Sequence, residues 1–239
     1  MKTITSFLFG GIFLLLSATS CIDFTRVMGN GIPASESRTV STFSKVKSSG
    51  DFSVYIYNGD ETNVDVKADE NLLQYIETYV SGGTLHIDIQ GVHDVKTVIP
   101  MEIYITTPQL SGIVQSGSGT ITSDYFESNQ FELVLSGSGR IEADFDTDLA
   151  EVLLSGSGKI NMVGLANNAS LTISGSGDLN GSDLQVKNCQ TLTSGSGNMW
   201  ISVSDNLSSR ISGSGNVYYS GNPTIHTSIS GSGKVISNY

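Results

Sequence analysis

The chain has 239 residues, with 12 lysines and arginines against 23 aspartates and glutamates and a net charge of −11. Such an acidic surface argues against nucleic acid as a partner and against electrostatic docking on anionic lipid. With only two cysteines, the fold is expected to be stabilised by packing and not by disulfides.

The N-terminus has the pattern of an exported lipoprotein. Lys2, an apolar run from Phe7 to Leu16 and four small residues precede Cys21, which is typical of a secretory signal peptide over residues 1–20. Small residues directly before a cysteine resemble the bacterial lipobox, which implies acylation of Cys21; an ordinary signal cleaved nearby is the alternative. Residues 21–39 show no periodicity and are expected to be a lipid-anchored tether. We therefore expect export across the inner membrane and anchoring in the cell envelope, at the outer membrane.

Residues 40–110 are expected to form irregular strands that cap one end of the fold, because a stack of strands needs protection from open-edge association. Alternating apolar residues predict four of these strands, at Phe52 to Ile56, Val64 to Val66, Leu85 to Ile89 and Met101 to Ile105. The segment from Asp69 to Ile76 fits one helical turn.

The tetrapeptide Ser-Gly-Ser-Gly recurs seven times within residues 111–239. Its copies begin at Ser116, Ser136, Ser155, Ser174, Ser194, Ser212 and Ser230. Steps of 18 to 20 residues are typical of a repeat architecture in which each unit stacks on the last. Apolar residues alternate around the copies, which predicts strands. We therefore predict an all-β fold for residues 40–239, a parallel β-solenoid of the right-handed β-helix type with one tetrapeptide per coil.

Both glycines of each tetrapeptide share the parity of the apolar residues and are expected to face inward. They are Gly117, Gly119, Gly137, Gly139, Gly156, Gly158, Gly175, Gly177, Gly195, Gly197, Gly213, Gly215, Gly231 and Gly233. Glycine in a strand costs roughly 0.5–1 kcal/mol relative to alanine, so geometry must require it. Either the cross-section of the solenoid is too narrow there for a Cβ, or the backbone adopts φ values that only glycine tolerates. We favour a flattened cross-section whose opposite walls nearly touch.

The serines then face outward and are expected to form a ladder with rungs about 4.8 Å apart. The candidate ligand surface comprises Ser136, Ser138, Ser155, Ser157, Ser174 and Ser176, with Trp200 and Tyr218 as aromatic side chains of outward parity. An aromatic ring there can stack on a sugar or cover a protein contact. The alternative is that serine is only a small, soluble neighbour for glycine.

One cluster of carboxylates stands out, because Glu142, Asp144, Asp146 and Asp148 alternate on one face. The last three are a candidate calcium site, and paired acids acting on a polysaccharide are a second reading. The third reading is a solvated acidic strand that discourages aggregation. Cys189 has the inward parity and is expected to be a small buried hydrophobe.

Three segments resemble a known family when taken with the lipobox and the repeats. They are Phe43-Ser44-Lys45-Val46, Phe52-Ser53-Val54-Tyr55-Ile56 and Gly83-Thr84-Leu85-His86-Ile87. Together they resemble the family "putative auto-transporter adhesin, head GIN domain", common in envelope proteins of Bacteroidetes. The resemblance covers residues 42–230 and implies a β-helix-like fold on a secreted or lipid-anchored protein. It brings no catalytic residues with it.

We therefore expect a protein that presents a surface in an adhesin-like or scaffold role, with no enzymatic activity and no cofactor. The expected partners are the membrane through Cys21, a glycan or an envelope or host surface protein, and a second copy of the chain. The alternatives are a carbohydrate- or lipid-binding module and a polysaccharide-active β-helix enzyme, which would need carboxylates and a base in one groove.

Overall fold

A computed structural model describes residues 26–92 and 94–238. The expected signal peptide and the acylation site Cys21 lie outside the described residues. Within the described part of the chain, no helix is long and apolar enough to cross a membrane.

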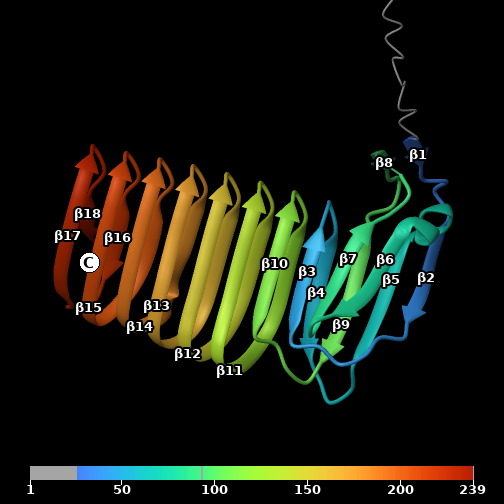
Figure 1. The fold of residues 1–239 in the computed structure, drawn as a ribbon, viewed down its shortest axis with the longest axis horizontal. Helices are drawn as coiled ribbons and strands as arrows, with labels where there is room; N and C mark the ends of the chain where they lie inside the picture. Colours follow the sequence, from blue (N-terminus) through green and yellow to red (C-terminus); the bar gives the residue numbers. More distant parts are fainter. Residues whose placement is uncertain (1–25, 93, 239) are drawn as a thin grey trace, which may run out of the picture.

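The predicted parallel β-solenoid is confirmed (Figure 1). Each long strand pairs in parallel with the strands before and after it in the chain, so successive coils lie side by side along one axis. The solenoid strands are β10 (Gly112–Gly117), β11 (Thr120–Gly137), β12 (Arg140–Gly156), β13 (Lys159–Gly175), β14 (Asp178–Gly195), β15 (Met199–Gly213), β16 (Val217–Ser220), β17 (Thr224–Gly231) and β18 (Val235–Ser237).

The N-terminal strands extend the same stack and then close it. Strands β3 and β4 form one further coil, because β3 pairs with β10 and β4 with β11. Beyond them, antiparallel pairs cover the end of the stack. The elements are β1 (Arg26–Met28), β2 (Pro33–Arg38), β3 (Lys45–Ser49), β4 (Ser53–Asn58), β5 (Asn63–Asp69), the 3₁₀ helix η1 (Glu70–Tyr75), β6 (Ile76–Ser81), β7 (Thr84–Ile89), β8 (Asp94–Lys96) and β9 (Glu102–Thr107).

The tetrapeptides occupy the same place on every coil. Ser116 pairs in register with Ser136, Ser136 with Ser155, and so on through Ser174, Ser194, Ser212 and Ser230. An eighth, degenerate copy lies at Ser49-Gly50, since Ser49 pairs with Ser116.

The tetrapeptide is a corner, so the apolar alternation on its two sides belongs to two strands and not to one. Strand β11 ends at Gly137 and β12 begins at Arg140, with Ser138 in a bend between them. Only the second glycine of each copy is buried, as at Gly139. The first is partly exposed and has a positive φ, +121° at Gly137. L-residues adopt such a φ only with strain, so the corner requires glycine there.

The favoured flattened cross-section is wrong as the reason for the second glycine. A Cβ on Gly158 would lie 2.5 Å from the carbonyl oxygen of Gly139, its counterpart on the preceding coil. The close approach is therefore along the stacking axis and not across the core. It accompanies backbone hydrogen bonds between the coils, because Lys159 N donates to the Gly139 carbonyl at 3.0 Å. The first glycine of the corner takes part as well, since the Gly117 carbonyl accepts hydrogen bonds from both Ser138 N (3.0 Å) and Gly139 N (2.9 Å). The same bifurcated contact recurs at each later copy.

The core is one continuous cluster that runs the length of the solenoid. Its columns consist of residues in register, such as Phe126 with Phe145. Rings from different columns also touch, since Phe131 stacks on Phe145 with ring centroids 4.5 Å apart. Cys189 lies in such a column as a buried free thiol, as expected. Burial raises its pKa to about 12, which keeps the thiol protonated and unreactive.

The expected tether boundary is wrong, because the folded part begins before residue 40. Strand β1 pairs with β8, and β2 pairs with β5. Neither strand has the apolar alternation that marks a half-buried strand in a sequence. They are held instead by backbone pairing and by the buried carboxylate of Asp69, which accepts hydrogen bonds from the backbone of Gly31, Val98 and Ile99.

Candidate functional site

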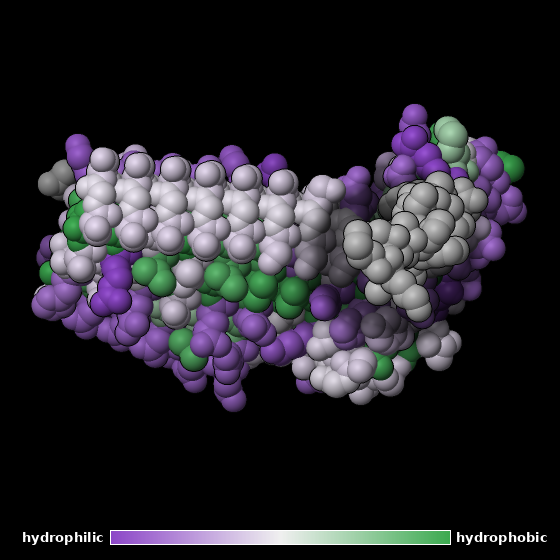
Figure 2. Space-filling model, turned by 45° about the horizontal axis from the view of Figure 1, so that its top comes forward, coloured by the Kyte–Doolittle hydropathy of each residue, from purple (hydrophilic) through white to green (hydrophobic). Residues whose placement is uncertain are grey.

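The expected serine ladder is present on the outside of the solenoid. Figure 2 shows its pale, flat surface running along the stack. Ser136, Ser138, Ser157, Ser174 and Ser176 are exposed, and Ser155 is half-buried. Within the described residues, the hydroxyls of the seven tetrapeptides form no hydrogen bonds to other protein groups. They remain free to bind water or a ligand.

An apolar strip lies directly beside this ladder. It consists of the outward residues two positions before each tetrapeptide, which pair in register from coil to coil. Its apolar members are Val114, Val134, Leu153 and Leu192, and both leucines are exposed. In Figure 2 this strip appears as a green band along the pale ladder. The strip is interrupted by Thr172 and continues as Arg210 and Ser228 on the last coils. The combined face therefore pairs a row of hydroxyls with a row of four apolar side chains.

An aromatic shelf lies on the other side of the serine corner. Trp200 on β15 and Tyr218 on β16 pair in register, and their rings stack with centroids 5.4 Å apart and an angle of 9° between planes. Both side chains are half-buried, so one part of the rings faces solvent. The structure thus brings together the two aromatic residues that the sequence singled out.

Polar groups surround the shelf in a shallow depression of about 390 Å³. It is lined by Lys159, Asn161, Asp178, Asn180, Ser182 and Trp200. Lys159 also lines a second depression of about 250 Å³, which contains the ladder residues Ser118, Ser138 and Ser157. The shelf and the serine ladder therefore adjoin, and together they offer a stacking surface beside amide, hydroxyl and charged groups. Such a combination suits a polar ring such as a sugar.

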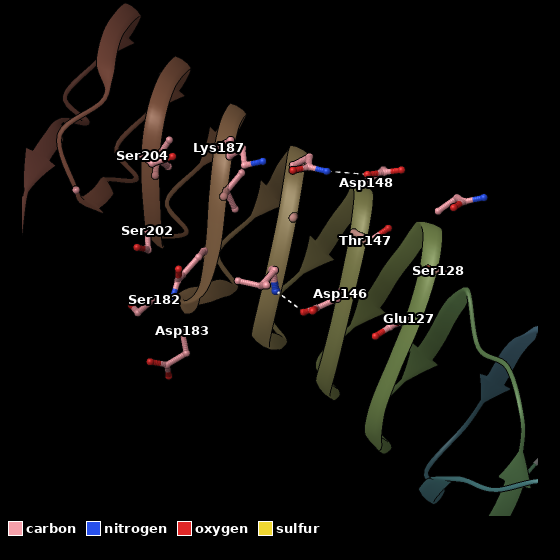
Figure 3. Close-up of a pocket in the computed structure, with 18 residues that line it drawn as sticks. Glu127, Ser128, Asp146, Thr147, Asp148, Ser182, Asp183, Lys187, Ser202 and Ser204 are labelled. Atoms are coloured by element: carbon pink, nitrogen blue, oxygen red, sulfur yellow. Dashed lines mark hydrogen bonds between the residues drawn. The ribbon is translucent and has the colours of Figure 1, made fainter.

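A larger groove of about 1000 Å³ runs along strands β11 to β15 and reaches Gly221 on the next coil (Figure 3). One row of its lining consists of residues that pair in register on successive strands: Glu127, Asp146, Leu165, Gln185 and Ser202. The lining is mainly polar, and its charged residues come from three strands: Glu127 from β11, Asp146 and Asp148 from β12, and Asp183 and Lys187 from β14. The groove offers an extended series of hydrogen-bonding groups along the axis.

The three candidate calcium ligands line up on β12 but do not form a site together. Asp146 accepts a hydrogen bond from Leu165 N at 2.9 Å, and Asp148 accepts one from the Asn167 side chain at 2.7 Å. Figure 3 shows both bonds reaching to the next coil. Burial raises the pKa of Asp144, and nearby carboxylates raise it further. Among the residues that the structure describes, no group of three or more His, Cys, Asp or Glu side chains is arranged to hold a metal.

The apolar strip and the large groove were not foreseen, although both leave a trace in the sequence. The strip breaks the alternation, because Val134-Leu135 and Leu153-Leu154 are adjacent apolar pairs. The groove lies near irregularities of pairing, such as that between Gly181 and Gln185. Irregularities of this kind accommodate the variation in coil length from 18 to 20 residues.

Several solved structures share this fold. A protein from Bacteroides fragilis, described as a putative adhesin, is 21% identical over 89% of this chain and 100% of its own, with a TM-score of 0.84. A protein from Parabacteroides distasonis, described as a putative lipid binding protein, is 24% identical over 90% of this chain and 100% of its own, with a TM-score of 0.73. A putative adhesin from Parabacteroides merdae is 22% identical over 90% of this chain and 99% of its own, with a TM-score of 0.72.

Comparison with curated protein sequences gives no match. A family model, in contrast, matches residues 42–223, which include six of the seven tetrapeptides. The chain therefore belongs to the family described as "Putative auto-transporter adhesin, head GIN domain".

Proposed function

We propose that the protein is a non-enzymatic lipoprotein of the cell envelope, held at the outer membrane by acylated Cys21, in an adhesin-like or scaffold role. The sides of its solenoid are the binding surface. The observation that carries this proposal is the register of the ladder serines, which repeats a row of hydroxyls from coil to coil. A repeated row suits an extended or multivalent partner, because each rung offers a similar contact.

The aromatic shelf is the part of this surface best suited to a carbohydrate. Trp200 and Tyr218 provide a stacked aromatic platform, and Asn180, which pairs with Trp200, provides an amide beside it. Sugars bind through stacking on such rings together with hydrogen bonds to their hydroxyls. The ladder serines next to the shelf extend the same type of contact along the axis.

A glycan array with residues 26–239 tests the carbohydrate assignment. We expect Trp200→Ala to weaken binding of any captured glycan at least about tenfold, since loss of one stacking contact and its buried area removes roughly 1.4 kcal/mol or more. Tyr57→Ala is the matched control, because Tyr57 is an exposed aromatic residue on the distant strand β4. Equal loss in both variants, or none in Trp200→Ala, would contradict the assignment.

A lipid ligand is the second candidate, and the apolar strip favours it. Leu153 and Leu192 each expose about two fifths of their surface, 40% and 41%. The Parabacteroides distasonis relative described as lipid binding has the same fold. Binding of a fluorescent fatty acid that is lost in Leu153→Asn and kept in Trp200→Ala would select this candidate over the carbohydrate.

A polysaccharide-active enzyme is the least supported alternative. Catalysis would need two free carboxylates converging on one bond. In the large groove, Glu127, Asp146 and Asp148 each accept a hydrogen bond from a protein group, which leaves Asp183 as the one lining carboxylate without such a bond among the described residues. Release of reducing sugar or unsaturated product from a captured glycan would contradict the non-enzymatic proposal.

A further inference from the structure

The last long strand of the solenoid exposes residues that every earlier coil buries. On β17, Ile225 is 37% exposed and Ile229 is 45% exposed. They pair in register with Leu207 and Ile211, which are 0% and 1% exposed in the same two core columns. Within residues 94–238, the end of the stack formed by β17 is thus an open section through the core.

The backbone edge of β17 is also unprotected. Among the described residues it pairs only with β15, so the other edge carries free N–H and C=O groups. Exposed edges are usually blunted by proline, lysine or other charges, yet Thr224–Gly231 contains none of these. At the opposite end, the terminal strand β2 carries the ion-paired charges of Glu36 and Arg38.

We propose that this edge pairs with the same edge of a second copy, in an antiparallel ladder centred on Thr227. Antiparallel pairing about a twofold axis places Ile225 of each copy opposite Ile229 of the other. Directly opposite residues in such a pair point to the same face, so both core columns continue across the junction. Ile225 and Ile229 each lie two residues from Thr227. The edge of one copy is therefore complementary to the same edge of another copy.

The charges of this end also suit a second copy. Residues 206–238 contain Arg210 and Lys234 but no aspartate or glutamate. The acidic residues that would make two copies repel each other therefore lie elsewhere in the chain. In the proposed ladder the outward residue His226 faces Ser228, and no two charged residues stand directly opposite.

The consequence for function rests on the proposed anchoring through Cys21. Strand β1, the first described element after that residue, lies at the end of the molecule opposite to β17 (Figure 1). A pair joined by the β17 edges therefore has its two N-termini at opposite ends of a rod. Such a pair connects two surfaces, so the partner of this adhesin-like protein would be a second copy on a facing membrane.

Cysteine cross-linking of residues 26–239, which contain the whole described core, tests the register. Thr227→Cys should form a disulfide-linked dimer under mild oxidation, because the two copies of residue 227 meet at the axis with Cβ atoms about 4.5–5.5 Å apart. Ser209→Cys is the control, since Ser209 is the buried counterpart one coil earlier. A dimer in the control and none in Thr227→Cys would overturn the proposal.

The molar mass in solution provides an independent readout. We expect a concentration-dependent dimer by light scattering, and a monomer for Ile225→Lys and Ile229→Lys with unchanged circular dichroism. Ser228→Lys, which adds the same charge to the outward side of β17, should still dimerise. A monomer at every concentration, a dimer that survives both isoleucine variants, or an open filament would contradict the proposal.

Vesicles that carry the protein through its N-terminus test the connection of two surfaces. Clustering that is lost in Ile229→Lys would support it, and unchanged clustering in that variant would overturn it. The glycan array distinguishes this result from the proposed function. A monomeric Ile229→Lys that still binds glycan would leave the carbohydrate assignment in place.

Discussion

At the scale of single residues, the second glycine of each tetrapeptide lacks a side chain because the preceding coil occupies its place. The degenerate copy at Ser49-Gly50 illustrates this. Phe52 pairs with the position of Gly119, yet it carries a large side chain that is 1% exposed. On the side away from Gly119, the coil of Phe52 meets Met101, directly before β9, since Ser53 N donates to the Met101 carbonyl at 2.9 Å. Among the described residues, no glycine corner lies beyond Phe52 on that side. One sequence position therefore accepts phenylalanine at the cap and only glycine within the stack.

Substitutions at neighbouring residues of one corner should therefore differ greatly in their effect on stability. In Gly158→Ala, the new Cβ would lie 2.5 Å from the Gly139 carbonyl oxygen and 2.7 Å from a methyl group of Leu135. Because the backbone contact cannot relax freely, we expect a loss of about 3 kcal/mol in the free energy of unfolding. Ser157→Ala, at the exposed position beside it, should change that free energy by about 0.5 kcal/mol or less. Urea unfolding followed by circular dichroism would measure both, and equal losses would refute the explanation.

At the scale of elements, the sequence predicts regular strands better than the joints between them. Alternation correctly indicated β4, β5, β7 and β9, and the helical turn near Asp69 is η1. It did not indicate β1 and β2, because backbone pairing and a buried carboxylate leave no apolar period. It did not reveal the corner within the tetrapeptide, because the corner preserves the parity of inward residues while φ changes sign at a glycine.

Asp69 joins two loops of the cap through its buried carboxylate. The stability of the protein should therefore depend on pH through this group. Burial would raise the pKa of its carboxyl, but hydrogen bonds from Ile99, Val98 and Gly31 outweigh burial and lower the pKa below 3.8. The unfolded chain therefore binds this proton more readily than the folded one. The resulting stability is present above pH 3.8 and is lost as the pH falls through the lowered pKa.

Asp69→Asn should therefore destabilise the protein at neutral pH and much less in acid. At pH 7 we expect a loss of about 1.5–3 kcal/mol, the usual contribution of hydrogen bonds to a charged group. The difference between variant and parent should shrink as the pH falls below 3.8. Urea unfolding across that range measures it. A difference that stayed constant with pH would show that the carboxylate charge is not what holds the cap.

At the scale of the whole molecule, the repeat period was sufficient to predict the solenoid and the positions of its outward rows. Trp200 and Tyr218 could be placed on one surface from parity alone, because parallel stacking in register preserves parity from coil to coil. The large groove could not be predicted, since it depends on where extra residues bulge out of register. The open β17 edge could not be predicted in detail either, because exposure of a core column depends on which neighbours are present.

The most direct test of the account is a series of distances along the serine ladder. Spin labels on Ser118→Cys paired with Ser196→Cys, Ser214→Cys or Ser232→Cys report separations across four, five and six coil steps; the native thiol of Cys189 is buried. With coils about 4.8 Å apart, pulsed electron paramagnetic resonance should give about 19, 24 and 29 Å, in equal increments. Distances that do not increase evenly from one copy to the next would contradict the stacking in register on which the proposed binding surface depends.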